Sequence, residues 1–93
     1  MALLLKTNGE QHDVAPNNGT DFTLEEMQGY VNGLIELIYL SDGRIMIINE
    51  EGAIDDVSEP NELAMELYMV IERRSVPMPL FGDILVIEKS QIR

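Results

Sequence analysis

Few side chains in this 93-residue sequence have the types and spacing that catalysis needs. His12 is the only histidine, and it lies beside Asp13 in a weakly predicted strand. No motif around it supplies the second catalytic group with which an imidazole would act. No serine lies in a G-x-S-x-G turn, and the chain has no cysteine, so the common covalent nucleophiles have no supporting motif. We therefore expect a protein that is not an enzyme.

A cluster of carboxylates offers the oxygen ligands that calcium and magnesium prefer. The cluster lies in one predicted loop and helix start and consists of Asp55, Asp56, Glu59 and Glu62. Its spacing does not match the EF-hand calcium loop, and acidic residues also stabilise the first turn of a helix through the helix dipole. A solvated acidic loop explains the cluster better, so we expect neither a metal ion nor a cofactor.

Polar and aromatic side chains could instead recognise a planar ligand. Asparagine amides can donate and accept at the edge of a base or ribose, tyrosine rings can stack, and arginines can neutralise phosphate. The residues predicted to bind such a ligand are Tyr39, Arg44, Asn49, Asn61, Tyr68 and Arg73. A local alternative exists for two of them, because Asn49 could close a turn and Asn61 could cap a helix.

A helix followed by a hairpin must position several of these residues. Thr23 and Glu26 have the spacing of a capping box, which predicts that a helix of about two turns begins there. The Asp-Gly pair at 42–43 then lies between apolar runs at 34–40 and 45–48. This pattern is the strongest local signal for a β-hairpin with a primed turn.

The rest of the chain completes a single small α+β domain. We expect strands over 2–6, 11–15 and 84–87, with a hairpin turn at Asn8-Gly9 between the first two, and a second helix that ends near Arg74. The apolar face of this helix, which should pack on the core, consists of Leu63, Ala64, Leu67, Tyr68, Val70 and Ile71. The predicted order is β-β-α-β-β-α-β, with two helices and a mixed, mainly antiparallel sheet of about five strands over residues 1–93.

Strands that are apolar along their whole length require cover on both faces of the sheet. Two helices can cover one face, or one face each, but a sheet of about five strands leaves some surface exposed. We therefore expect a homodimer or a larger assembly. Met65 and Met69 fall on the charged arc of the second helix, where they could form an adaptable subunit contact or be ordinary surface methionines.

The net charge of −11 argues against direct binding to nucleic acid or to an anionic membrane. No apolar run has the length of a signal-peptide core or a membrane span, so we expect a cytoplasmic protein. Ten of the 17 acidic residues lie between Glu25 and Glu62, with Arg44 as the only cation among them. The negative electrostatic potential of this region would attract a basic protein partner. Acidic surfaces also simply keep small proteins soluble.

Several short motifs together resemble a family of small phage and bacterial proteins known as a domain of unknown function, number 3846. The resemblance spans roughly residues 22–88, and its motifs are residues 31–36, Asp42-Gly43, residues 49–52, Asn61 with Ala64, and residues 82–86. It implies a phage or mobile-element protein inside a bacterial host cell, and it brings no catalytic residues.

Two functions remain open. Small phage assemblies that sequester nucleotide immune signals are similar in size and also lack catalytic groups. By this analogy we expect a non-enzymatic protein that binds a nucleotide-like signal and acts against host defence. The alternative is an acidic protein-interaction module, or a nucleic-acid mimic, that binds a basic host protein.

Overall fold

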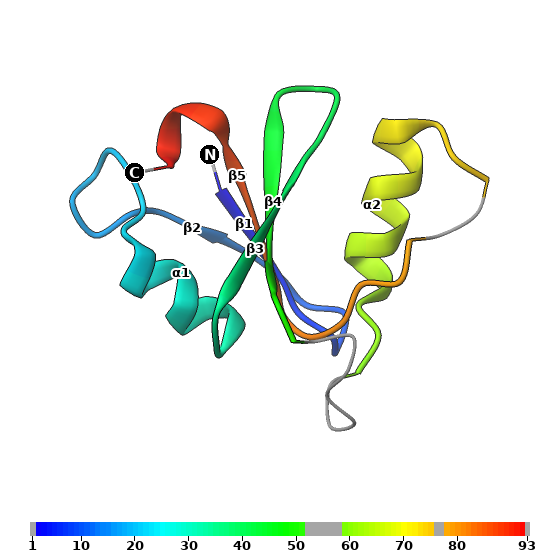
Figure 1. The fold of residues 1–93 in the computed structure, drawn as a ribbon, viewed down its shortest axis with the longest axis horizontal. Helices are drawn as coiled ribbons and strands as arrows, with labels where there is room; N and C mark the ends of the chain where they lie inside the picture. The colour runs from blue at the N-terminus through cyan, green and yellow to red at the C-terminus, as the bar shows by residue number, and fades with distance from the viewer. Residues whose placement is uncertain (1, 52–58, 76–77, 93) are drawn as a thin grey trace.

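The computed structural model describes residues 2–51, 59–75 and 78–92, which form a five-stranded sheet with one helix on each face (Figure 1). The predicted order β-β-α-β-β-α-β is confirmed. The elements are β1 (Ala2–Leu5), β2 (Gln11–Val14), α1 (Leu24–Val31), β3 (Ile35–Tyr39), β4 (Arg44–Asn49), α2 (Glu62–Glu72) and β5 (Ile84–Glu88), followed by a short 3₁₀ turn at Lys89–Gln91.

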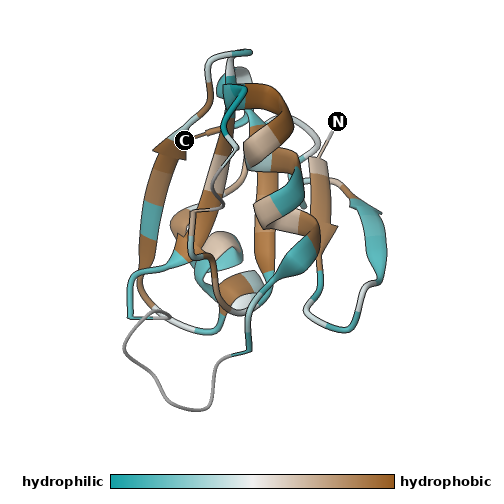
Figure 2. Ribbon diagram, turned by 90° about the vertical axis from the view of Figure 1, so that its right-hand side faces the viewer, coloured by the Kyte–Doolittle hydropathy of each residue, from teal (hydrophilic) through white to brown (hydrophobic). Residues whose placement is uncertain are grey.

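The strands lie in the order β2-β1-β5-β4-β3, and each neighbouring pair is antiparallel. The C-terminal strand β5 is therefore the centre of the sheet, where it joins the β1–β2 hairpin to the β3–β4 hairpin. The two edges differ in character, because β2 is mostly hydrophilic and β3 is mostly hydrophobic (Figure 2).

Both hairpins use the same turn geometry, which differs from the predicted primed turn. At the β3–β4 turn, Gly43 donates to the Leu40 oxygen at 3.1 Å and Leu40 donates to the Arg44 oxygen at 2.8 Å. Among the described residues of this turn only Gly43 has a positive φ, at 94°. A type I turn followed by a left-handed glycine has this pattern, whereas a type I′ turn needs two residues with positive φ. The Asn8-Gly9 turn shows the same bonds.

The sheet carries a separate apolar core on each face. Along β4, Ile45 and Ile47 face α1, while Met46 faces α2. The α1 core consists of Ala2, Phe22, Met27, Val31, Ile45, Ile47, Leu85 and Ile87, and the α2 core of Leu5, Leu40, Met46, Ala64, Leu80, Ile84 and Val86. Uninterrupted apolar strands are thus explained by one helix on each face, which was one of the two arrangements expected.

The helix α2 is rotated relative to its predicted orientation. Its buried face is centred on the fully buried Ala64, so Met65 packs at the margin of the α2 core instead of lying on the charged arc. Val70, predicted to be part of the core stripe, is 73% exposed. Periodicity defines the width of an apolar arc, but the contact with the sheet decides which part of that arc is buried. In the described part of the chain, no helix has the length and apolar character to cross a membrane.

Candidate functional site

Asn61 lies fully buried at the start of α2, where its side chain makes three hydrogen bonds. Its Oδ1 accepts from the main-chain amide of Ala64 at 3.0 Å, which makes Asn61 the N-cap of the helix. Its Nδ2 donates to the main-chain oxygens of Leu5 and Gly82, each at 2.8 Å. Since one acceptor and both donors are used inside the protein, Asn61 presents no group to a ligand in this conformation.

Asn49 lies at the end of β4 and connects it to the end of α1. Its Nδ2 donates to the main-chain oxygens of Val31 at 3.0 Å and Asn32 at 3.3 Å, and its Oδ1 accepts from the amide of Glu51 at 2.8 Å. Asn49 therefore closes a turn and completes the C-terminal cap of α1. A ligand would have to displace these bonds to use the same amide.

Arg44 forms an ion pair inside its own turn. Its Nε donates to Oδ2 of Asp42 at 2.8 Å, and its main-chain amide donates to Oδ1 at 3.0 Å. Burial raises the pKa of Asp42, but the hydrogen bonds and charge of Arg44 outweigh that effect and hold this pKa below its ordinary value. Much of the positive charge of Arg44 is thus balanced locally.

The other three predicted ligand residues have different environments. Tyr39 ends β3 and is 64% exposed, while Tyr68 is half-buried against the α2 core. Arg73 is the exposed C-cap of α2, in the left-handed conformation with φ of 53°.

These six residues do not meet at one place within a single chain. Arg44 and Asn49 lie at opposite ends of β4, about 16 Å apart at the usual rise of a strand, and their side chains point to opposite faces. Asn61 and Arg73 lie at opposite ends of α2. A ligand site made of these residues would need contributions from more than one subunit.

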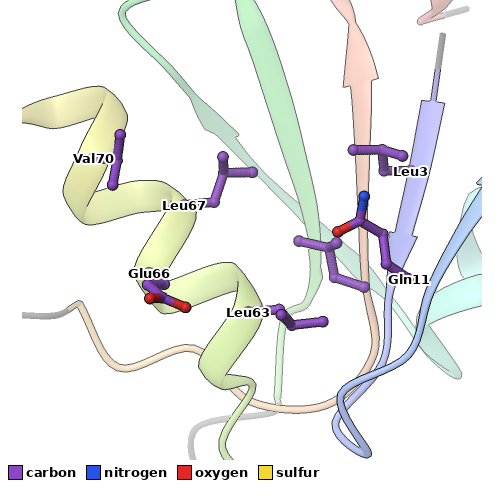
Figure 3. A pocket seen from close by; sticks show the side chains of 7 residues that line it. Leu3, Gln11, Leu63, Glu66, Leu67 and Val70 are labelled. Atoms are coloured by element: carbon purple, nitrogen blue, oxygen red, sulfur yellow. The ribbon is translucent and has the colours of Figure 1, made fainter.

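The structure instead shows an apolar groove between α2 and the β1–β2 hairpin, with a volume of about 340 Å³. Side chains from α2 and from the two strands face each other across it (Figure 3). We call it the α2 groove, and its lining consists of Leu3, Leu5, Gln11, Leu63, Glu66, Leu67 and Val70. Its strand side consists of Leu3 and Leu5 of β1 and Gln11 of β2, the edge strand of that half of the sheet.

Sequence reasoning missed the α2 groove, although one signal pointed to it. Leu63, Leu67 and Val70 were all assigned to the buried stripe of the second helix, and this stripe is wider than the strip of sheet that the helix covers. An apolar arc wider than its contact leaves a margin of apolar side chains beside the helix.

The charges around the α2 groove are mainly negative. Glu66 lies in its lining, and Asp13 lies on the same face of the sheet because it pairs with Leu3. The neighbouring Lys6 is 3.7 Å from the carboxylate of Asp83, so this cation is paired. The described lining contains neither lysine nor arginine.

The residues considered for metal binding do not form a centre within the described chain. Across residues 2–51, 59–75 and 78–92, no group of three or more histidine, aspartate and glutamate side chains is placed to hold a metal ion. Asp55 and Asp56 lie outside the described residues. Nε2 of His12 lies 2.9 Å from the Glu10 carboxylate at an exposed edge, and this hydrogen bond lowers the pKa of Glu10.

The fold and the groove define a small α+β domain whose sheet is covered on both faces. The chain belongs to the DUF3846 family, described as a domain of unknown function, and the match covers residues 1–91. The resemblance found over residues 22–88 is thereby confirmed and extends to the first hairpin. No curated protein and no solved structure is a significant match. Because the family description carries no activity, function has to be argued from the surface of this chain.

Proposed function

We propose that this protein is a non-enzymatic interaction module that binds a basic, amphipathic segment of another protein in the α2 groove. The observation that carries the proposal is the combination of an apolar lining with acidic neighbours in one groove. Leucines at positions 3, 5, 63 and 67 supply the apolar surface, while Glu66 and Asp13 supply negative charge. A helical segment with an apolar face flanked by cationic side chains would satisfy both.

The charge of the whole chain supports the same partner. The formal net charge of −11 would attract a cationic segment and raise its rate of association. The apolar contacts would then determine how slowly the bound segment dissociates.

The nucleotide-sequestering function has less support from the described residues. A phosphate in the α2 groove would meet Glu66 without a lysine or arginine in the lining. Arg44 is paired with Asp42, and Arg73 lies beyond the last lining residue of α2. The interaction module is therefore the function that the geometry favours, and a host partner would agree with the phage setting that the family resemblance implies.

The test uses a synthetic helical peptide of leucine and lysine residues as the probe, titrated into the full chain by calorimetry. Val70→Lys places a cation on the rim of the groove, and we expect it to weaken binding about tenfold, as loss of an interface anchor does. Leu24→Lys is the matched control, because Leu24 is 54% exposed on the opposite face of the sheet.

The salt dependence supplies the second readout. We expect binding of the peptide to weaken as ionic strength rises, since the attraction depends on unscreened surface charge. Equal effects of Val70→Lys and Leu24→Lys would show that the peptide binds the acidic surface without using the α2 groove, and would overturn the proposal. A co-purified nucleotide in native mass spectra would favour the sequestering function instead.

A further inference from the structure

Within residues 2–51, 59–75 and 78–92, β3 is an edge strand of the sheet, with no described strand on its outer side. Leu40 donates to the Arg44 oxygen and Glu50 donates to the Leu34 oxygen, each at 2.8 Å, so the even-numbered residues of this region bond to β4. In an antiparallel pair, the alternate residues direct their main-chain groups away from the partner. The amides and oxygens of Ile35, Leu37 and Tyr39 therefore point to the open edge.

The open edge of β3 lacks the features that normally prevent pairing between proteins. Such edges are usually protected by proline, lysine, bulges or inward-pointing charges. β3 reads Ile-Glu-Leu-Ile-Tyr and has only Glu36 as a charged residue, and the flanking Leu34 and terminal Tyr39 are 57% and 64% exposed. The other edge strand, β2, reads Gln-His-Asp-Val with its first three residues exposed. The apolar character is thus confined to one edge.

This edge is complementary to a second copy of itself. If two β3 strands pair antiparallel with Leu37 opposite Leu37, then Ile35 of each copy lies opposite Tyr39 of the other. These are the three residues whose main-chain groups point outward, so each pair exchanges both of its hydrogen bonds. The same register places the exposed Tyr39 ring against an isoleucine side chain, a favourable cross-strand pair.

The charges select the same register. With Leu37 at the centre, Glu36 lies opposite Ile38 of the second copy, so the two carboxylates are not directly opposed. A register centred on Glu36 would place two glutamates opposite each other and leave Tyr39 without a partner residue from the strand. Like charges directly opposite destabilise a pair of strands.

We propose that two copies of this chain pair through β3, in antiparallel orientation and centred on Leu37, to form one continuous sheet. This interface lies at the β3 edge, at the opposite end of the strand order from β1 and β2, which border the α2 groove. Such a dimer would agree with the homodimer expected from the sequence. Its subunits would be joined by main-chain hydrogen bonds rather than by contacts between helix surfaces.

Cysteine crosslinking tests the register directly, because the chain has no cysteine of its own. In the proposed dimer the two Leu37 Cα atoms lie about 5.5 Å apart, within the range of a disulfide. The two Tyr39 Cα atoms lie about 14 Å apart, because they are offset by four residues along the strands. Under mild oxidation we expect Leu37→Cys to give a covalent dimer and Tyr39→Cys to stay mostly uncrosslinked.

The Tyr39→Cys variant is the control, because solvent exposure alone would predict the opposite result. Tyr39 is more exposed than Leu37, so random collisions would crosslink Tyr39→Cys at least as fast, and that result would overturn the proposal. A second experiment avoids the half-buried position 37. Light scattering should give twice the chain mass for the wild type and for Leu24→Lys, and the chain mass for Tyr39→Lys. A wild-type protein that remains monomeric at all concentrations would also contradict the dimer.

Discussion

The side-chain amide of Asn61 donates to the main-chain oxygen of Leu5 at 2.8 Å, and this bond joins α2 to β1 across 56 positions of the chain. The same nitrogen donates to Gly82, which precedes β5. One buried side chain therefore links the start of α2 to β1 and to the segment that leads into the neighbouring strand β5. The α2 groove lies directly beside this link, since Leu5 and Leu63 both line it.

The first prediction concerns the stability that Asn61 provides. Asn61→Ala removes the cap of α2 and leaves the buried oxygens of Leu5 and Gly82 without their donor. We expect a loss of about 3 kcal/mol in the free energy of unfolding, measured with urea. Asn8→Ala is the control, because Asn8 makes an exposed bond to the amide of Glu10 and its loss should cost less than about 1 kcal/mol. Equal losses would contradict the role assigned to Asn61.

The second prediction couples Gly33 to Asn49. A Cβ atom built at Gly33 would lie 2.8 Å from Nδ2 of Asn49, which donates to the oxygen of Val31. We expect Gly33→Ala and Asn49→Ala each to destabilise the protein, the first by displacing the amide and the second by removing it. The double variant should be less destabilised than the sum of the two by about 1 kcal/mol, because the clash is then absent. Additive losses in chemical denaturation would show that the two positions act independently.

The third prediction is a pH dependence that comes from Glu26. Hydrogen bonds from the main-chain amides of Asn17 at 2.9 Å and Thr23 at 3.1 Å hold the pKa of Glu26 below its ordinary value. A pKa lowered by folding means that the charged form stabilises the folded state above the pKa of the unfolded chain. This stabilisation is lost as the pH falls through the lowered pKa, because the carboxylate then becomes protonated.

Thermal unfolding across the acidic range measures this effect. We expect Glu26→Gln to have a lower Tm than the wild type near neutral pH, and the two values to converge below the usual carboxylate pKa. Glu25→Gln removes the same charge from the first turn of α1 and is the control, which should keep the wild-type pH profile. A difference between Glu26→Gln and the wild type that stays constant with pH would contradict the assignment.

The start of α1 and the two hairpins could be predicted from sequence, because each is determined by residues only a few positions apart. The capping box of Thr23 and Glu26 forms as predicted, with the Glu26 amide donating to the Thr23 hydroxyl at 3.2 Å. The Asp-Gly and Asn-Gly pairs also mark the two hairpins. The turn type was wrong because an Asp-Gly pair occurs in both turn geometries, and they differ in the φ of the residue before the glycine and in the main-chain bonds.

The candidate site was less predictable because it depends on contacts between distant elements. The partners of Asn61 are main-chain oxygens at positions 5 and 82, and main-chain groups leave no mark on the sequence. The position of β5 between β1 and β4 likewise follows from packing of the whole sheet. The α2 groove is likewise built from distant parts of the chain, since its lining combines residues of α2 with residues of β1 and β2.

The fourth prediction contrasts two glycines that have equal space but different backbone conformations. A Cβ atom at Gly29 or at Gly43 would meet no atom within 4 Å, so packing has no part in either substitution. Gly29 lies within α1, where alanine is the better helix former, and Gly29→Ala should stabilise the protein by about 0.5–1 kcal/mol.

Gly43 has a φ of 94°, a conformation that side chains with a Cβ disfavour, so Gly43→Ala should instead destabilise by about 1 kcal/mol or more. The measurement is urea denaturation of both variants beside the wild type, and the sign of each change is the test. Changes of the same sign would show that one of the two backbone conformations differs in solution. Opposite signs, with α1 gaining and the turn losing, would confirm both the helical state of Gly29 and the left-handed glycine that closes the β3–β4 hairpin.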